Sequence, residues 1–383
     1  MTAETANRRT DNVHPAVIDR RYRIHRKAMR SHQLEAKSPD RSWQMRNLAH
    51  DLAYSLPVMP PAPPCACFPV SDHCDGRRFF NPRGHVNHGW LDVLKWRRTS
   101  RPTPWPRWVE ITPQPPPLAP RGDGLAATWI NQATFLLQTA HGAVLTDPVF
   151  SERAGPFNRA GPPRVHVPGV SFEALPRIAV VLLSHDHYDH CDLATLRRLA
   201  REHDPLLITP LGNGRLARRA GLKRVVELDW WQAHEIAPGF TVTATPARHW
   251  SNRLSGPRNG RLWGGFSLRA GGRTAHFVGD TAYDGTMFRE IREKLGAPQL
   301  ALVPIGAYEP RWFMSAYHCN PAEAVQIHRD LGAQLSVAMH WGTWQLTDEG
   351  RDEPPQALAE ARVAAGLAAD AFRVLAPGES VAI

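Results

Sequence analysis

The sequence lacks any uncharged apolar run of the ~18 residues that a transmembrane helix needs, and its first residues are too charged and polar for a secretory signal. Cysteine is also scarce. The chain has five, an odd number without the repeated spacing of a disulfide framework or a zinc ribbon: Cys65, Cys67, Cys74, Cys191 and Cys319. We therefore expect a cytoplasmic protein, with any membrane contact peripheral and on the inner membrane surface.

Negative charge is in the minority, and the excess of positive charge is uneven. The formal net charge is +10, and residues 1–50 alone hold eleven Arg and Lys against five Asp and Glu. Such a basic arm lies on nucleic acid or anionic lipid in some proteins and is a solvated tail in others, so charge alone does not choose a partner. We expect residues 1–75 to form a basic, proline-rich and partly disordered N-terminal arm, and residues 76–383 to form one folded domain.

Between residues 55 and 117, two proline-rich stretches flank a stretch that is rich in aromatic and aliphatic residues. The prolines over residues 55–64 and 113–117 indicate extended connectors, because proline fixes φ and donates no amide hydrogen bond. Between them, the Phe, Trp, Leu and Val residues of 79–96 are too apolar for a free linker. We expect this stretch to pack on the folded body or to form an interaction surface with lipid or a second subunit.

From residue 127 onward, short apolar runs alternate with turns and amphipathic stretches, and 42% hydrophobic residues are ample for a core. We expect strands over 127–130, 134–139, 143–146, 178–183, 206–209, 224–228, 240–246, 264–268, 274–278, 300–304 and 336–339. We expect helices over 193–202, 212–220, 286–295 and 321–331, the last capped by Asn320 with Pro321 in its first turn. Strands with helices between them indicate sheets covered by helices.

The densest chemical signal directly follows the apolar run 178–183. Within Ser184–His190, four candidate ligands, three imidazoles and one carboxylate, occur in six residues: His185, His187, Asp189 and His190. Imidazole nitrogen and carboxylate oxygen are good ligands for zinc and similar divalent ions. A strand that ends in such a loop holds its ligands on a rigid platform, so we expect a preorganised metal site.

Three more candidate ligands follow later predicted strands. His249, Asp280 and His340 are each the first strong metal-binding side chain after a strand. A catalytic zinc needs about three protein ligands, so seven candidates indicate two metals that share one carboxylate. Of the neighbours, we expect Asp147 to orient a ligating histidine through its second ring nitrogen, and Asp186 to lie behind the ligands or to face solvent.

This arrangement resembles the metallo-β-lactamase superfamily over roughly residues 128–340. The resemblance implies an α+β fold, a four-layer αβ/βα sandwich, here with a proline-rich N-terminal extension. It places His185, His187 and His249 on one zinc. It places Asp189, His190 and His340 on the other, with Asp280 bridging, so the expected cofactor is two Zn²⁺, although other divalent metals also suit these ligands.

A narrower similarity is carried by five segments: Phe79–Pro82, Trp129–Thr134, Thr146–Ala154, Pro304–Met314 and His340–Thr343. They resemble the N-acyl-phosphatidylethanolamine-hydrolysing phospholipase D family. The chain departs from the family at Asn131, where glycine is usual, and at Cys191, where leucine is usual. Neither position is a candidate ligand.

The resemblance implies a zinc-dependent phosphodiesterase that hydrolyses N-acyl phosphatidylethanolamine to N-acylethanolamine and phosphatidic acid, by attack of a metal-bridging hydroxide on phosphorus. It implies catalytic roles for Asp189, Asp280 and His318, the last beside the phosphate. The expected partners are a phospholipid substrate and a membrane surface, with no nucleic acid and a homodimer left open. The alternatives are a lactonase or nuclease of the same superfamily, or a membrane-associated adaptor without catalysis.

Overall fold

The computed structural model describes residues 68–383, except 85 and 87. The predicted arm over residues 1–75 lies almost wholly outside the described residues, so its boundary stays a prediction. Residues 68–81 pack on the folded body, where Phe68, Cys74 and Phe79 join a small cluster with Trp230 and Trp263. Cys74 and Phe79 are therefore buried by neighbouring parts of the domain, whereas Val70 remains exposed.

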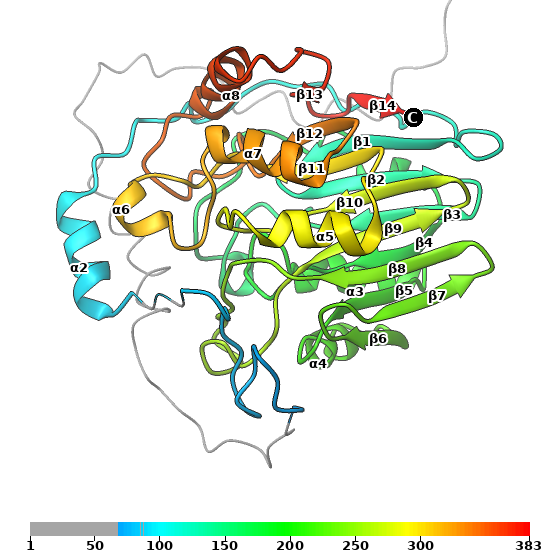
Figure 1. Cartoon of the computed structure of the whole chain (residues 1–383), viewed down its shortest axis with the longest axis horizontal. Coiled ribbons are helices and arrows are strands. Elements are labelled where there is room, and N and C mark those ends of the chain that lie inside the picture. The colour runs from blue at the N-terminus through cyan, green and yellow to red at the C-terminus, as the bar shows by residue number, and fades with distance from the viewer. Residues whose placement is uncertain (1–67, 85, 87) are drawn as a thin grey trace, which may run out of the picture. The chain divides into compact units, whose positions relative to one another are not determined.

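Two sheets of seven strands each form the centre of the domain (Figure 1). The first has the order β14 (Ser380–Ala382), β1 (Leu125–Asn131), β2 (Thr134–Thr139), β3 (Gly142–Thr146), β4 (Ile178–Leu182), β5 (Leu206–Pro210) and β6 (Arg224–Leu228). The second has the order β13 (Phe372–Arg373), β12 (Leu335–Met339), β11 (Leu300–Pro304), β10 (Arg273–Phe277), β9 (Gly265–Ala270), β8 (Phe240–Thr245) and β7 (Ala233–Ala237).

Helices cover the outer faces of both sheets. The main core contains side chains of both sheets together with α5 (Met287–Leu295) and α7 (Pro321–Leu331). A second core joins the other face of the first sheet to α3 (Leu193–Glu202) and α4 (Gly214–Arg219). This order of helix, sheet, sheet and helix confirms the predicted four-layer sandwich, with α5 and α7 on the opposite side from α3 and α4 (Figure 1).

Local chemistry explains where the covering helices begin. Asp192 caps α3 by accepting a hydrogen bond from the Ala194 amide. Asn320 and Glu323 form a reciprocal capping box on α7, with Pro321 in the first turn as predicted. These caps satisfy amides that would otherwise have no partner at a helix start.

All eleven predicted strands and all four predicted helices are present, with small shifts at their ends. The prediction omitted β7, β13, β14, α2 (Trp90–Thr99), α6 (Arg311–Met314) and α8 (Glu353–Ala364), as well as the 3₁₀ turns Pro156–Asn158 and Phe172–Ala174. The short strands β13 and β14 are defined by partners far away in the chain. In the described part of the chain, no helix has the length and apolar character needed to cross a bilayer.

Candidate metal centre

The candidate ligands meet at one edge of the two sheets because four strands end there. The loop after β4 carries the histidine-rich motif, while His249, Asp280 and His340 follow β8, β10 and β12. The last three strands run in the same direction, since β9 is antiparallel to both β8 and β10, and β11 is parallel to β10 and β12. All seven side chains therefore come to a common place.

A close backbone approach holds His340 in position. His340 has a left-handed φ of 62° directly after β12. A Cβ atom on Gly306, in the loop after β11, would lie 2.1 Å from the His340 carbonyl oxygen. Only glycine permits this approach, so the two neighbouring strand ends pack tightly beneath the centre.

The first group of ligand atoms consists of three imidazoles. His185 Nε2 lies 2.9 Å from His187 Nδ1, and His249 Nε2 lies 3.2 Å from the same atom. Two nitrogens that bind one zinc at 2.0–2.1 Å in a tetrahedron are about 3.4 Å apart. The spacing and the neutral donors fit a divalent metal of the zinc type.

The second group contains two imidazoles and a carboxylate. His190 Nε2 and His340 Nε2 are 3.1 Å apart, and Asp189 Oδ2 lies 3.3 Å from the former and 3.2 Å from the latter. This group also has the spacing of atoms around one metal.

Asp280 faces both groups with the same oxygen atom. Its Oδ2 lies 3.1 Å from both His190 Nε2 and His340 Nε2 in the second group. In the first group, the same oxygen lies 3.7 Å from His249 Nε2 and 3.9 Å from His185 Nε2. This geometry is the one expected of a carboxylate shared by two metal ions, and the ligand assignment itself stays a prediction.

Burial and charge make the two groups electrostatically different. Burial lowers the pKa of His187 and of His249 to about 3, and lowers that of His185 well below its usual value. These imidazoles are therefore neutral near pH 7, the form that binds a metal. Burial acts in the same direction on His190 and His340, but the nearby carboxylates outweigh it.

For His190, the charges of Asp280 and Asp189 raise the pKa well above its usual value despite burial. Asp280 likewise raises the pKa of His340 to about 9. Near pH 7 the His190 and His340 imidazoles therefore carry protons, and their positive charge lies beside the carboxylates of Asp189 and Asp280. A metal cation bound there would displace both protons, so metal binding at this group should release protons.

Hydrogen bonds orient the ligand rings from outside. His190 Nδ1 donates to Asp147 Oδ2 at 2.6 Å, as predicted for Asp147, and the Ser184 hydroxyl donates to the same carboxylate at 2.5 Å. His249 Nδ1 donates to the Tyr317 carbonyl oxygen at 3.0 Å. In both rings Nε2 is left free to face the centre, which is the usual arrangement around a bound metal.

Gln132 is a functional neighbour that the sequence did not indicate. Its side-chain amide donates to Asp189 Oδ2 at 3.0 Å, and its backbone carbonyl accepts a hydrogen bond from the His340 amide at 2.9 Å. The residue sits in the β1–β2 turn with a left-handed φ of 42°. Two signals were available: its place directly after a strand that ends at the same edge, and its position within the segment Trp129–Thr134 that carries the family resemblance.

Asp186 is buried rather than solvent-facing, so that alternative of the prediction was wrong. Its Oδ2 lies 2.7 Å from Arg261 Nη1, and its Oδ1 accepts a hydrogen bond from the Asn252 amide. A buried carboxylate needs such a partner. The Asp186–Arg261 ion pair therefore connects the motif loop to the segment that follows His249.

His318 lies beside both groups. Its ring centroid is 5.0 Å from that of His249 and 5.4 Å from that of His340. Burial lowers its pKa well below the usual value, and its buried Nδ1 has no hydrogen-bond partner among the described residues. A neutral imidazole in this position is free to contact a bound substrate.

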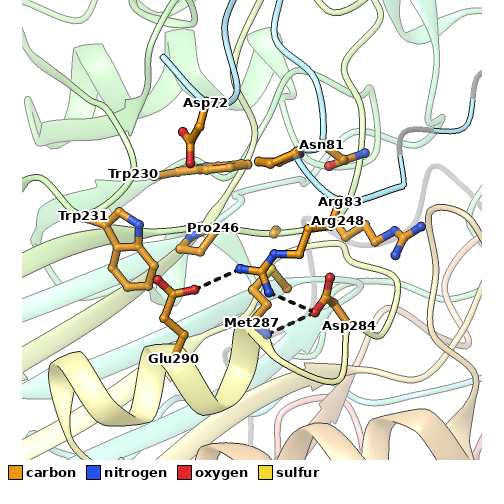
Figure 2. A pocket seen from close by; sticks show the side chains of 12 residues that line it. Asp72, Asn81, Arg83, Trp230, Trp231, Pro246, Arg248, Asp284, Met287 and Glu290 are labelled. Atoms are coloured by element: carbon orange, nitrogen blue, oxygen red, sulfur yellow. Dashed lines mark hydrogen bonds and ion pairs between the residues drawn. The ribbon is translucent and has the colours of Figure 1, made fainter.

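A cavity of about 120 Å³ lies outside this centre (Figure 2). Trp230, Trp231 and Arg248 line it, and Arg83 crosses it to pair with Glu290 at 3.1 Å. None of the seven candidate ligands lines this cavity. It borders the centre through Arg248, which precedes His249 in the chain, and through Asn81, which donates to the His249 carbonyl, so we assign the chemistry to the strand-end cluster.

A family model described as a beta-lactamase superfamily domain matches residues 143–341. The fold agrees with that of an isothiocyanate hydrolase from Delia radicum gut bacteria, with a TM-score of 0.53 and 21% identity over 67% of this chain and 98% of that one. The class of the protein is therefore a metal-dependent hydrolase with the metallo-β-lactamase fold.

Closer relatives narrow the class. N-acyl-phosphatidylethanolamine-hydrolyzing phospholipase D 1 of Caenorhabditis elegans is 38% identical over 62% of this chain and 69% of its own length. The mitochondrial N-acyl-phosphatidylethanolamine-hydrolyzing phospholipase D of Saccharomyces cerevisiae is 34% identical over 60% of this chain and 50% of its own length. Within the metallo-β-lactamase superfamily, the chain belongs to the N-acyl-phosphatidylethanolamine-hydrolysing phospholipase D family.

Proposed function

We propose that the protein is a phosphodiesterase of the phospholipase D type that uses two zinc ions. Its substrate would be N-acyl phosphatidylethanolamine, and its products N-acylethanolamine and phosphatidic acid. The observation that carries the binuclear part is Asp280 Oδ2, which faces both ligand groups at 3.1–3.9 Å. Family membership supports the substrate class.

Bound metal ions would hold a phosphodiester oxygen, stabilise its growing negative charge and lower the pKa of water toward ~7. The chain itself supplies the orientation. Asp147 and the Tyr317 carbonyl fix two ligand rings, while Gln132 holds Asp189. The low pKa of His318 keeps its imidazole neutral, so it would donate one hydrogen bond to the phosphate without placing another charge in the centre.

Asp280 would handle the proton in the reaction, beyond its place between the ligand groups. Its Oδ1 is buried and has no hydrogen-bond partner among the described residues. This oxygen is available to take a proton from the attacking water and to pass it to the leaving ethanolamine oxygen.

The test is hydrolysis of N-acyl phosphatidylethanolamine in detergent by the full chain loaded with two equivalents of zinc, with both products measured by mass spectrometry. Asp189→Asn should lower the rate by more than about a hundredfold, since even outer partners of metal ligands cost 10–100-fold. Asp370→Asn, on an exposed residue far from the ligands in the chain, is the matched control and should retain full activity.

Two outcomes contradict the proposal separately. Cleavage of lactones or RNA without cleavage of the phospholipid would refute the substrate class. Less than one metal per chain in protein prepared without chelator would refute the binuclear centre.

A further inference from the structure

Helix α2 carries apolar side chains on the side that faces solvent. The exposed fractions are 67% for Trp90, 61% for Leu91 and 38% for Leu94, and the helix has no fully buried residue. An ordinary surface helix places such side chains against the core. This reversal indicates a surface that contacts something outside the chain.

Cations share this side of the helix. Positions i, i+1, i+4, i+5 and i+8 lie on one side of an α-helix, and here they form what we name the α2 face: Trp90, Leu91, Leu94, Lys95 and Arg98. Both cations are exposed. The one acid of the helix, Asp92, is half-buried and accepts a hydrogen bond from the Gly89 amide, so it does not balance them.

A second aromatic extends the α2 face. Trp312 of α6 is 40% exposed, and the Lys95 ammonium lies 4.5 Å from the centre of its ring. Figure 1 shows α6 beside α2. Tryptophan, leucine and basic residues on one short helix are the composition of segments that lie in the boundary between lipid head groups and acyl chains.

The geometry points to the α2 face as a docking surface for an anionic phospholipid bilayer, with Trp90, Leu91, Leu94 and Trp312 entering the head-group region. Lys95 and Arg98 would contact lipid phosphates while their stems remain in apolar surroundings. A twofold contact between two copies would instead bring these like charges together. Charge therefore favours lipid over a second copy as the occupant.

Helix α2 also packs against the segment that leads to the metal centre. On its inner side, Trp96 stacks on Phe313 with ring centroids 5.0 Å apart. Tyr317, four residues later, donates its hydroxyl to the Val86 carbonyl, and its own carbonyl accepts the hydrogen bond from His249. Docking on this side would bring the bilayer next to the loop that carries His318. The purpose of this docking rests on the proposed lipid function.

Vesicle binding tests this inference without catalysis. The full chain would be sedimented with phosphatidylcholine vesicles, with and without phosphatidylglycerol, at low and high salt. High salt screens the attraction between the anionic vesicles and the positive charges of the N-terminal arm, which is present in every variant. At high salt, the triple variant W90A/L91S/L94S should bind the vesicles at least about tenfold more weakly than the unaltered chain does, because each apolar side chain buried in the bilayer contributes a factor of this order.

The control for the apolar change is L118S/V363S, which alters side chains that are 94% and 81% exposed elsewhere. K95Q/R98Q should weaken binding to the anionic vesicles by about fivefold per cation at low salt, whereas R219Q on α4 should not. Melting temperatures check that each variant is folded.

Binding by the triple variant equal to that of the unaltered chain would overturn the inference. So would a change from dimer to monomer in the triple variant with unchanged vesicle binding, which would identify a second copy as the occupant. Normal vesicle binding by a chain that does not hydrolyse the phospholipid would refute the proposed function and leave the docking surface standing.

Discussion

Asp280 is the residue on which both candidate ligand groups depend. One of its two oxygens, Oδ2, lies within 3.9 Å of four histidine nitrogens. The neighbouring histidines hold the pKa of its carboxyl well below the usual range despite burial. The carboxylate is therefore charged and ready to bind metal over the whole physiological pH range. Around it, single hydrogen bonds set the direction of each ring.

Asp147→Asn should weaken metal binding by about 10–100-fold, because the neutral amide is a poorer acceptor for His190 Nδ1 and leaves the ring less basic. Competition with a coloured chelator measures this affinity without any assay of activity. Asp370→Asn serves as the control on an exposed carboxylate. Equal affinity in both variants would show that Asp147 does not act through His190.

At the scale of elements, a buried histidine adds ion pairs to the apolar contacts that hold the segment 68–81 on the domain. His73 Nε2 lies 2.7 Å from Asp229 Oδ1, and Nδ1 lies 2.6 Å from Asp72 Oδ1, while the ring stacks on Trp230. Burial lowers the pKa of His73, but the hydrogen bonds to Asp229 and Asp72 outweigh it and raise the pKa above 6.5. Asn81, at the end of this segment, donates to the His249 carbonyl.

The raised pKa sets the direction of a pH effect. The charged form of His73 stabilises the fold fully below pH 6.5, the value of the unfolded chain, and this contribution is lost as pH rises through the folded-state pKa. The difference in free energy of unfolding between the unaltered chain and His73→Gln should therefore be larger at pH 6 than at pH 9. Denaturant titrations at both pH values measure it.

The control for this comparison is His141→Gln, a substitution of an exposed histidine outside the segment. A His73→Gln difference that is the same at both pH values would mean that the ring acts by packing on Trp230 rather than by charge.

At the scale of the whole molecule, the centre joins the two sheets, because its ligands come from the ends of β4 in one and β8, β10 and β12 in the other. Metal ions bound to the folded state stabilise the whole domain by mass action. The buried carboxylates and imidazoles that remain after their removal need protons or water as partners, and the two sheets lose a common attachment.

Chelation should therefore lower the melting temperature of the protein by about 5–15 °C, and added zinc should restore it. Scanning calorimetry of one sample before chelation, after chelation and after zinc addition measures the effect. Asp189→Asn should show a smaller shift. An equal melting temperature with and without metal would argue against a bound ion in the folded protein.

Much of the fold was predictable because its signals are local. Strands such as β4 and β11 are short apolar runs bounded by turn residues, and Asn320 with Glu323 is a recognisable helix start. The omitted strand β14 pairs with β1, 252 residues apart at the contact between Thr128 and Ser380. Such pairing has no local pattern, and α2 escaped prediction because its apolar residues lie on both sides of the helix, with Trp90, Leu91 and Leu94 exposed and Trp96 packed on Phe313.

The sequence by itself determined which side chains are candidate ligands, since a dense histidine motif and single polar residues after strands are visible in one dimension. Their grouping was an expectation from the family resemblance, and only the tertiary structure supplied the distances, because Asp280 Oδ2 reaches both groups through strand directions that depend on long-range pairing. The same holds for Gln132 beside Asp189 and Tyr317 beside His249, contacts between residues 57 and 68 positions apart. Hydrogen bonds between distant segments follow from packing, which no local pattern encodes.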